Sequence, residues 1–154
     1  MDVNLEKVIQ KEMIILNEEV KSKDYAIDLL INKAEKLKLI SEKEKLKESV
    51  IDRETIVSTA IGFDIAMPHG KSETVNQPFI GFLQASNSFK WSENQDEMAS
   101  LIFLIAVPLE KSNNLHLKFI SSLSKKLLDE DYRNKLKEAN SKQEVFELLR
   151  NITN

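Results

Sequence analysis

The sequence predicts a layered α/β domain, and three observations lead to this fold class. Segments with helical spacing lie toward both ends of the 154-residue chain. Between them, at 64–70, 78–85 and 99–108, lie short apolar segments of strand length. The segment 99–108, ASLIFLIAVP, is so apolar that both of its faces must be covered, which predicts a central strand. Helices that flank a group of strands on both sides in sequence favour a layered α/β domain over a bundle or a sandwich.

The N-terminal part predicts a strand followed by two helices. The apolar run EMIIL at 12–16 has the length of a short strand. At 24–37, apolar residues recur with the spacing of one helix face: Ile27, Leu30, Ala34 and Leu37. Ser41, with Glu44 three positions later, has the form of a capping box that opens a helix as far as about residue 50 or 51.

The C-terminal part predicts two further helices. Segment 114–129 places apolar residues at four-residue steps, a stripe that faces the core: Leu115, Phe119, Leu123 and Leu127. Ser141 and Glu144 form a second predicted capping box, which opens the helix KQEVFELLRNI. Phe79, Phe82 and Phe103 are expected in the core together with Phe119, and Trp91 is expected to anchor a polar loop.

Length and charge limit the possible functions. A chain of this size is expected to form one domain over residues 1–154, and a net charge of −3 with interleaved signs argues against a nucleic-acid partner. The interleaved charges are interpreted as solvated helix faces. Charges in the N-terminal segment and the lack of a long apolar run predict a soluble, cytoplasmic protein without membrane insertion. Without cysteine, and with two histidines far apart, no metal site is expected.

The unusual backbone residues cluster in one region. All three glycines, all three prolines and both histidines lie between Gly62 and His116. In IAMPHG, Pro68 and Gly70 hold His69 in a defined direction, and a neutral imidazole can act as a base, a ligand or a phosphoryl acceptor. No nucleotide-binding loop or serine-nucleophile motif is present, so no cofactor is expected. The residues alone leave a functional and a structural, hydrogen-bonded His69 equally open.

The segment before this histidine has the composition of an anion site. DRETIVSTAIG, at 52–62, combines several hydroxyl groups with Arg53, a set suited to phosphate. The alternatives are structural: Arg53 would pair with carbonyl groups at a helix end, Thr59 would be a turn or cap residue, and His116 would be a solvated first-turn residue.

Two segments resemble a known family. DRETIVSTAIGFDIAMPHGK (52–71) and LIFLIAVPLEKSNNLHLKFISSLSKKLLD (101–129) are similar to the enzyme IIA domain of the fructose/mannitol class of the bacterial sugar phosphotransferase system. The similar features are Arg-Glu, Ser/Thr-Thr, the Pro-His-Gly block and a later His-Leu that opens a helix. The resemblance implies a three-layer α/β/α sandwich with a mixed central sheet.

The resemblance also implies a role for each matched residue. His69 would be phosphorylated by the carrier protein HPr and would pass the phosphoryl group to the IIB component of a sugar transporter. Arg53, Thr59 and His116 match the family's positions near this group. AIGFDIAM departs from the glycine-rich form usual in the family, which leaves the loop conformation there open.

Three functions follow as alternatives. The first is a phosphotransferase component for sugar uptake, with fructose as the first guess. The second is a regulatory module of the nitrogen-regulatory type, phosphorylated on the same histidine and acting by protein binding. The third is an interaction domain of the same fold that is not phosphorylated.

Overall fold

The computed structural model describes residues 8–92, 96–110 and 114–150. The elements follow in the order β1 (Ile9–Glu18), α1 (Lys23–Lys36), α2 (Lys43–Ile56), β2 (Ala60–Gly62), β3 (Ile65–Ala66), β4 (His69–Ser72), β5 (Phe79–Lys90), β6 (Met98–Pro108), α3 (Leu115–Lys126), α4 (Glu130–Glu138) and α5 (Lys142–Arg150). No helix in these ranges is both long and apolar enough to cross a membrane.

The six strands form one mixed sheet in the order β1-β5-β6-β3-β2, with β4 also paired to β6. β1 lies parallel to β5, β5 lies antiparallel to β6, and both β3 and β4 lie parallel to β6. The apolar segment 99–108 thus forms the central strand that its composition predicts. Alternate β6 side chains enter two separate cores, with Leu101, Phe103 and Ile105 on one side and Ile102, Leu104 and Ala106 on the other.

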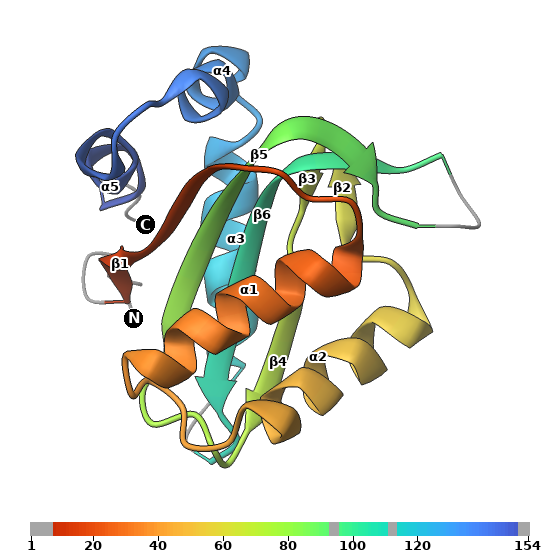
Figure 1. The fold of residues 1–154 in the computed structure, drawn as a ribbon, viewed down its shortest axis with the longest axis vertical. Helices are drawn as coiled ribbons and strands as arrows, with labels where there is room; N and C mark the ends of the chain where they lie inside the picture. Colours follow the sequence, from red (N-terminus) through yellow and green to blue (C-terminus); the bar gives the residue numbers. More distant parts are fainter. Residues whose placement is uncertain (1–7, 93–95, 111–113, 151–154) are drawn as a thin grey trace.

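The helices cover both faces of the sheet (Figure 1), as the three-layer prediction requires. Helices α1 and α2 cover one face, where α1 contributes Ala26, Ile27, Leu30, Ile31 and Ala34 to the core. On the other face, α3, α4 and α5 supply Phe119, Leu123, Tyr132, Leu136, Val145 and Leu149. The four phenylalanines predicted for the core are all buried.

Segment 64–70, predicted as one strand, is interrupted. β3 and β4 follow one another along the same edge of β6, and Met67 and Pro68 separate them. The Pro68 carbonyl still accepts a hydrogen bond from Ile105 N, at 3.0 Å. Proline has no N–H to complete the ladder, which accounts for the break directly before His69.

A tight turn joins β2 to β3 in the segment that departs from the family pattern. Gly62, Phe63 and Asp64 have φ angles of 91°, 57° and 69°, all in the left-handed region. Ser88 and Ser100 donate to the Asp64 carboxylate, and the Arg133 guanidinium lies 4.0 Å from the centre of the Phe63 ring. These contacts offset the cost of left-handed backbone at two residues other than glycine.

The helix starts differ in part from the predictions. The capping box at Ser41 is wrong: Glu42 is the N-cap of α2 and makes no side-chain cap bond, while Ser41 Oγ donates to Thr74 O at 3.4 Å. The serine half of the capping box at Ser141 is confirmed, because its Oγ accepts from Glu144 N at 3.1 Å; the Glu144 carboxylate accepts from Asn140 N, at 3.3 Å, one residue earlier than in a full capping box. The sequence analysis missed α4, a short and strongly charged helix.

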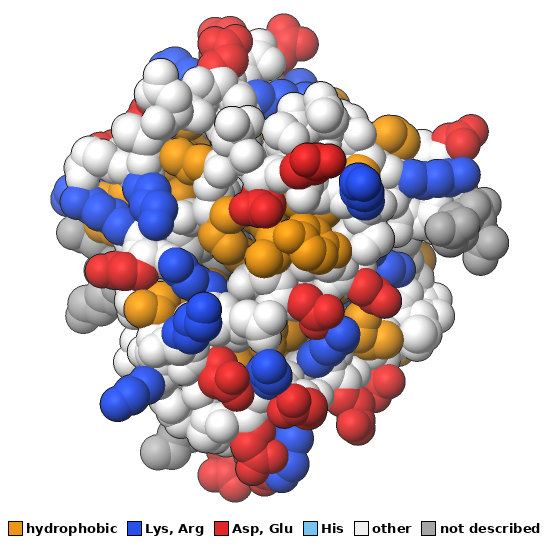
Figure 2. All heavy atoms as spheres, viewed as in Figure 1, with side chains coloured by type: hydrophobic (Ala, Val, Ile, Leu, Met, Phe, Trp, Pro, Cys, Tyr) orange, Lys and Arg blue, Asp and Glu red, His pale blue; other side chains and the backbone are white. Residues whose placement is uncertain are grey.

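The surface of α1 and α2 carries interleaved charges of both signs (Figure 2). Two ion pairs connect exposed side chains there, Lys47 with Asp28 at 2.7 Å and Lys45 with Glu73 at 3.1 Å. Exposed pairs of this kind contribute little to stability. The charges are the solvated helix faces that the sequence predicts.

Helix α5 packs beside β1, which is an edge strand of the sheet. Its Val145 and Leu149 share a core cluster with Ile9 and Ile14 of β1. The start of β1 and the end of α5 therefore lie on the same side of the molecule (Figure 1).

Candidate functional site

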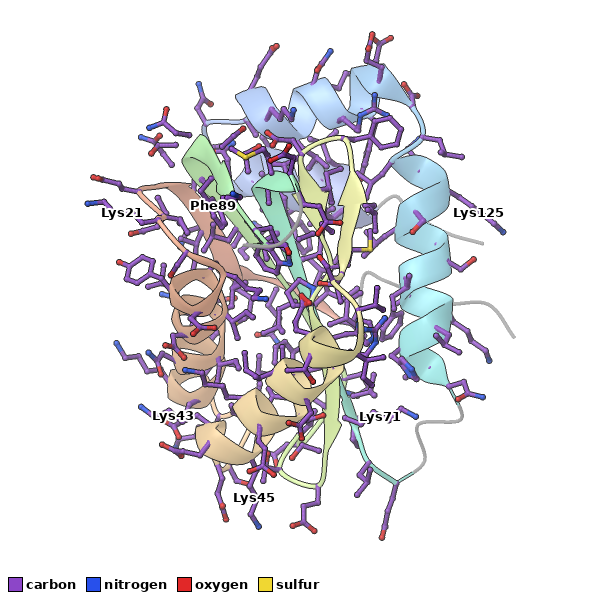
Figure 3. All side chains as sticks on the ribbon, turned by 90° about the vertical axis from the view of Figure 1, so that its right-hand side faces the viewer. Lys21, Lys43, Lys45, Lys71, Phe89 and Lys125 are labelled. Carbon is purple, nitrogen blue, oxygen red and sulfur yellow. The ribbon has the colours of Figure 1, made fainter. Side chains whose placement is uncertain are left out.

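A cavity of about 450 Å³ lies where α2 ends, β4 begins and α3 starts, and it is open to solvent. Figure 3, turned by 90° from Figure 1, shows α2, β4 and α3 and labels Lys71 near them. All four predicted site residues line this cavity: Arg53, Thr59, His69 and His116. The fold therefore brings together residues that are up to 63 positions apart, from Arg53 to His116.

His69, the first residue of β4, is half-buried and has one ring nitrogen bound to the backbone. Its Nδ1 lies 3.0 Å from the Met67 carbonyl oxygen, which can only accept, so Nδ1 carries the proton. The second nitrogen, Nε2, then holds the lone pair, and it has no hydrogen-bond partner among the described residues. The site thus presents a nucleophilic nitrogen in a fixed orientation.

His116 lies in the first turn of α3, and its ring stacks near that of His69, with centroids 5.7 Å apart and planes at 29°. Its Nδ1 is buried and has no hydrogen-bond partner among the described residues. His116 thus places a second imidazole beside a histidine that presents a lone pair.

Both imidazoles are held in the neutral form. Burial lowers the pKa of His69 below 6.5, the Met67 hydrogen bond and the Glu54 charge oppose this, and the Arg53 charge reinforces it. Burial also lowers the pKa of His116, with the charge of Lys71, the neighbouring His69 and the charge of Arg53 acting in the same direction. At neutral pH the His69 lone pair is therefore available.

The charged side chains that line the cavity are all cationic, which favours an anion. Two cationic side chains, Arg53 and Lys71, line it, and no carboxylate does. The sequence analysis missed Lys71, although its spacing was a signal: it lies two residues after His69 on one strand, so both side chains share a face. No ion pair to Lys71 is found among the described residues.

Arg53 and Thr59 line the cavity, and each also makes a hydrogen bond within the protein. Arg53 Nη1 donates to Val57 O at 2.8 Å and so satisfies a carbonyl at the end of α2. A guanidinium has five N–H donors, so others remain for a ligand. Thr59 is buried, and its hydroxyl donates to the Glu54 carboxylate. Glu54 is a second residue that was not assigned to the site from the sequence, although it belongs to the Arg-Glu pair of the family pattern; its burial shows its importance.

Strand β4 approaches α2 closely at Gly70. A Cβ atom at this position would lie 2.9 Å from Val50 Cγ2 and 3.2 Å from Val50 N. The Lys71 amide also donates to Ser49 Oγ at 3.0 Å. Glycine is therefore needed here for contact with the helix, at the residue directly after His69. In the part of the chain that the structure describes, no group of His, Asp and Glu residues could hold a metal ion.

Comparison with known proteins agrees with this geometry. The family described as phosphoenolpyruvate-dependent sugar phosphotransferase system, EIIA 2, matches residues 7–152. A fructose-specific EIIA component from Haloferax volcanii is 32% identical over 153 residues, which is 99% of each chain.

Two solved structures share the fold. The nitrogen regulatory protein IIA-Ntr from Neisseria meningitidis aligns with a TM-score of 0.83 and 27% identity, over 94% of this chain and 97% of its own. Enzyme IIAMTL from Escherichia coli, in complex with phosphorylated enzyme IIBMTL, aligns with a TM-score of 0.78 and 28% identity, over 92% and 98%. The fold, the family match and the residues of the cavity agree, and the chain belongs to the EIIA type 2 family of the phosphoenolpyruvate-dependent sugar phosphotransferase system.

Proposed function

We propose that His69 accepts a phosphoryl group from phosphorylated HPr and passes it to a IIB component during sugar uptake. The observation that carries the proposal is the bond from His69 Nδ1 to Met67 O, which leaves Nε2 as a lone-pair nitrogen at a cationic cavity. The membership of the family and the similarity to a IIA protein in complex with its phosphorylated IIB partner support it.

Each transfer exchanges one P–N bond for another bond to phosphorus. The Nε2 lone pair attacks the phosphorus atom, and the donor nitrogen of HPr leaves with the electron pair of the bond that breaks. The phosphorylated ring retains its Nδ1 proton and becomes positively charged, and the Met67 carbonyl stabilises that charge. In the second step the IIB nucleophile attacks the same phosphorus atom, and Nε2 recovers its lone pair.

Catalysis of such a step consists mainly of positioning and charge stabilisation. Phosphoryl transfer passes through a loose transition state with negative charge on three equatorial oxygens. We assign stabilisation of this charge to Arg53 and His116, which line the same cavity as His69. Thr59 completes the site; because its hydroxyl is bonded to Glu54, we assign it to holding the cavity wall. The mechanism needs no metal or nucleotide.

The mouth of the cavity is suited to a protein partner. Exposed apolar side chains lie at or next to its lining and are 41 to 78% exposed. Ile61 and Leu117 line the cavity, and Ile56 and Val57 directly precede its lining residue Ser58. We call these four residues the apolar rim. Exposed apolar patches of this kind mark sites of protein interaction. The rim would allow HPr and IIB to dock in turn and exclude water from the phosphoryl group.

The proposed phosphohistidine could serve sugar uptake or regulation, and the relatives bear on this choice. The Haloferax volcanii relative is named fructose-specific, which supports sugar uptake with fructose as the sugar. The similarity to IIA-Ntr supports the regulatory alternative, in which the same phosphohistidine controls binding to another protein. Sequence identity is higher to the fructose component, 32% against 27%, so we place sugar uptake first.

Phosphorylation in vitro tests the proposal. With phosphoenolpyruvate, enzyme I and HPr, the protein is expected to gain one phosphate that is labile in acid and stable in base, measured by intact mass. His69→Ala should gain none, because it lacks the acceptor nitrogen. His116→Ala should still gain it but should transfer it to IIB at least tenfold more slowly, because it loses a neighbouring donor.

Two outcomes would contradict the proposal. A phosphate that persists on His69→Ala would place the acceptor elsewhere. A wild-type protein that stays unmodified would favour the interaction domain without phosphorylation. Lys118→Ala, which removes an exposed charge outside the cavity lining, serves as the control and should behave as wild type.

A further inference from the structure

Glu54 is a buried carboxylate just outside the cavity. It is 6% exposed, and no ion pair to it is found among the described residues. Three donors satisfy it instead: Thr59 N at 3.1 Å, the Thr59 hydroxyl, and Trp91 Nε1 at 3.0 Å. A buried charge is costly unless it is well hydrogen-bonded, so the position of Glu54 calls for an explanation.

The hydrogen bonds continue from Glu54 to the imidazole of His69. Glu54 holds Thr59, whose carbonyl oxygen accepts from Met67 N at 3.1 Å. The Met67 carbonyl in turn accepts from His69 Nδ1 at 3.0 Å. Two backbone units therefore connect a buried carboxylate to the ring nitrogen that decides which tautomer His69 adopts.

We propose that Glu54 is the positioning residue of His69 and acts through the backbone of Thr59 and Met67. The carboxylate fixes the loop between α2 and β2, this loop holds the Met67 peptide, and the Met67 carbonyl keeps the proton on Nδ1. The proposal rests on the proposed function only in that Nε2 is taken as the phosphoryl acceptor. Orientation of this kind matters because small displacements of a reacting atom cost large factors in rate.

Trp91 forms the outer end of this chain of hydrogen bonds. It is the only tryptophan of the sequence, is 2% exposed, and is held by a bond from its own N to Glu97 O at 2.8 Å. It connects the segment between β5 and β6 to the site, which extends its predicted role as a loop anchor. Trp91→Phe removes one donor to Glu54 and leaves both bonds from Thr59 intact.

The test is Glu54→Gln, which retains the shape and removes one acceptor oxygen. The amide has a single acceptor oxygen for the three donors, so the Thr59 loop loses part of its anchor. We expect a folded protein in which the ¹⁵N signals of His69 show a smaller share of the Nδ1–H tautomer. The single-turnover rate of phosphorylation should fall by about tenfold to a hundredfold, with the Kd for phospho-HPr unchanged.

Gln84→Met is the matched control. Gln84 is also buried, and its amide donates to Leu136 O at 3.0 Å and Ala139 O at 2.8 Å, but none of its bonds leads to His69. This variant should lose stability while the His69 tautomer and the rate stay as in wild type. If Glu54→Gln behaves in the same way, Glu54 is merely structural and the proposal is wrong.

A second variant, Trp91→Phe, keeps the test decisive. Should Glu54→Gln fail to fold, Trp91→Phe must shift the His69 tautomer in the same direction by a smaller amount, and an unchanged tautomer would overturn the proposal. The tautomer is measured without any phosphoryl donor. Failure of the proposed function would therefore appear as an unphosphorylated wild type, and failure of the Glu54 proposal as an unchanged ¹⁵N spectrum.

Discussion

His69 and His116 differ in what surrounds their Nδ1 atoms. The Met67 carbonyl holds the proton of His69 on Nδ1, whereas His116 Nδ1 has no hydrogen-bond partner among the described residues. In the proposed function, His69 is therefore the nucleophile and His116 assists it. The motif in the sequence was enough to predict both residues, with Arg53 and Thr59. It could not predict that Glu54 supports Thr59, because that contact depends on how the loop after α2 folds. Lys71 was overlooked, although its place two residues after His69 puts both side chains on one face of β4.

Arg53 provides a prediction at the scale of one side chain. Arg53→Ala should slow phosphoryl transfer by on the order of a hundredfold, because it removes charge stabilisation in the transition state. Arg53→Lys should recover only part of the rate, since an ammonium cannot offer a planar fork while also satisfying Val57 O. Rapid-quench kinetics measures the rate, and thermal unfolding checks the fold. If the rate in Arg53→Ala were unchanged, the role of Arg53 would be structural only, through its hydrogen bond to Val57 O at the end of α2.

At the scale of elements, the strongly patterned segments were predicted well and the irregular ones were not. Central strand β6 and helix α3 follow from composition and spacing, since burial alone determines both patterns. The break between β3 and β4 and the hairpin β2-β3 were missed, because they depend on Pro68 and on a left-handed turn supported by contacts with β5, β6 and α4. Local pattern carries no information about such distant contacts.

The contact of β4 with α2 leads to a second prediction. Gly70→Ala places a methyl group 2.9 Å from Val50 Cγ2, so the strand or the helix must shift. We expect a loss of about 1 to 3 kcal/mol in the free energy of unfolding, measured by urea denaturation. The double variant Gly70→Ala/Val50→Ala should be less destabilised than the sum of the two single variants, because the second change removes the nearest of the three close atoms, the others being Ser49 Oγ at 3.0 Å and Val50 N at 3.2 Å. Strict additivity would show that the contact with Val50 Cγ2 does not cause the loss.

At the scale of the whole molecule, burial of two histidines in one cavity couples stability to pH. The folded state lowers the pKa of His69 and of His116, whereas both have the ordinary value of 6.5 when the chain unfolds. The unfolded state therefore binds more protons below about pH 6.5, and the folded state loses stability as the pH falls. Well above that pH both histidines are neutral in both states, so they cause no loss of stability.

Urea denaturation between pH 7.5 and 5 checks this linkage. The free energy of unfolding should fall below about pH 6.5, by at most about 1.4 kcal/mol per pH unit for each histidine. The double variant His69→Gln/His116→Gln should lose stability less steeply over the same range, because it lacks both titrating groups. Equal slopes for the two proteins would show that the histidines titrate normally in the folded state.

The packing of α5 against β1 has a consequence for how this unit can be built into larger assemblies. Both described ends of the chain lie on the side of the molecule formed by β1 and α5 (Figure 1), whereas residues at the end of α2, in β4 and in α3 line the cavity. A module joined beyond these ends would be connected through β1 or α5, neither of which contributes a residue to the cavity. The fold thus separates the points of attachment from His69.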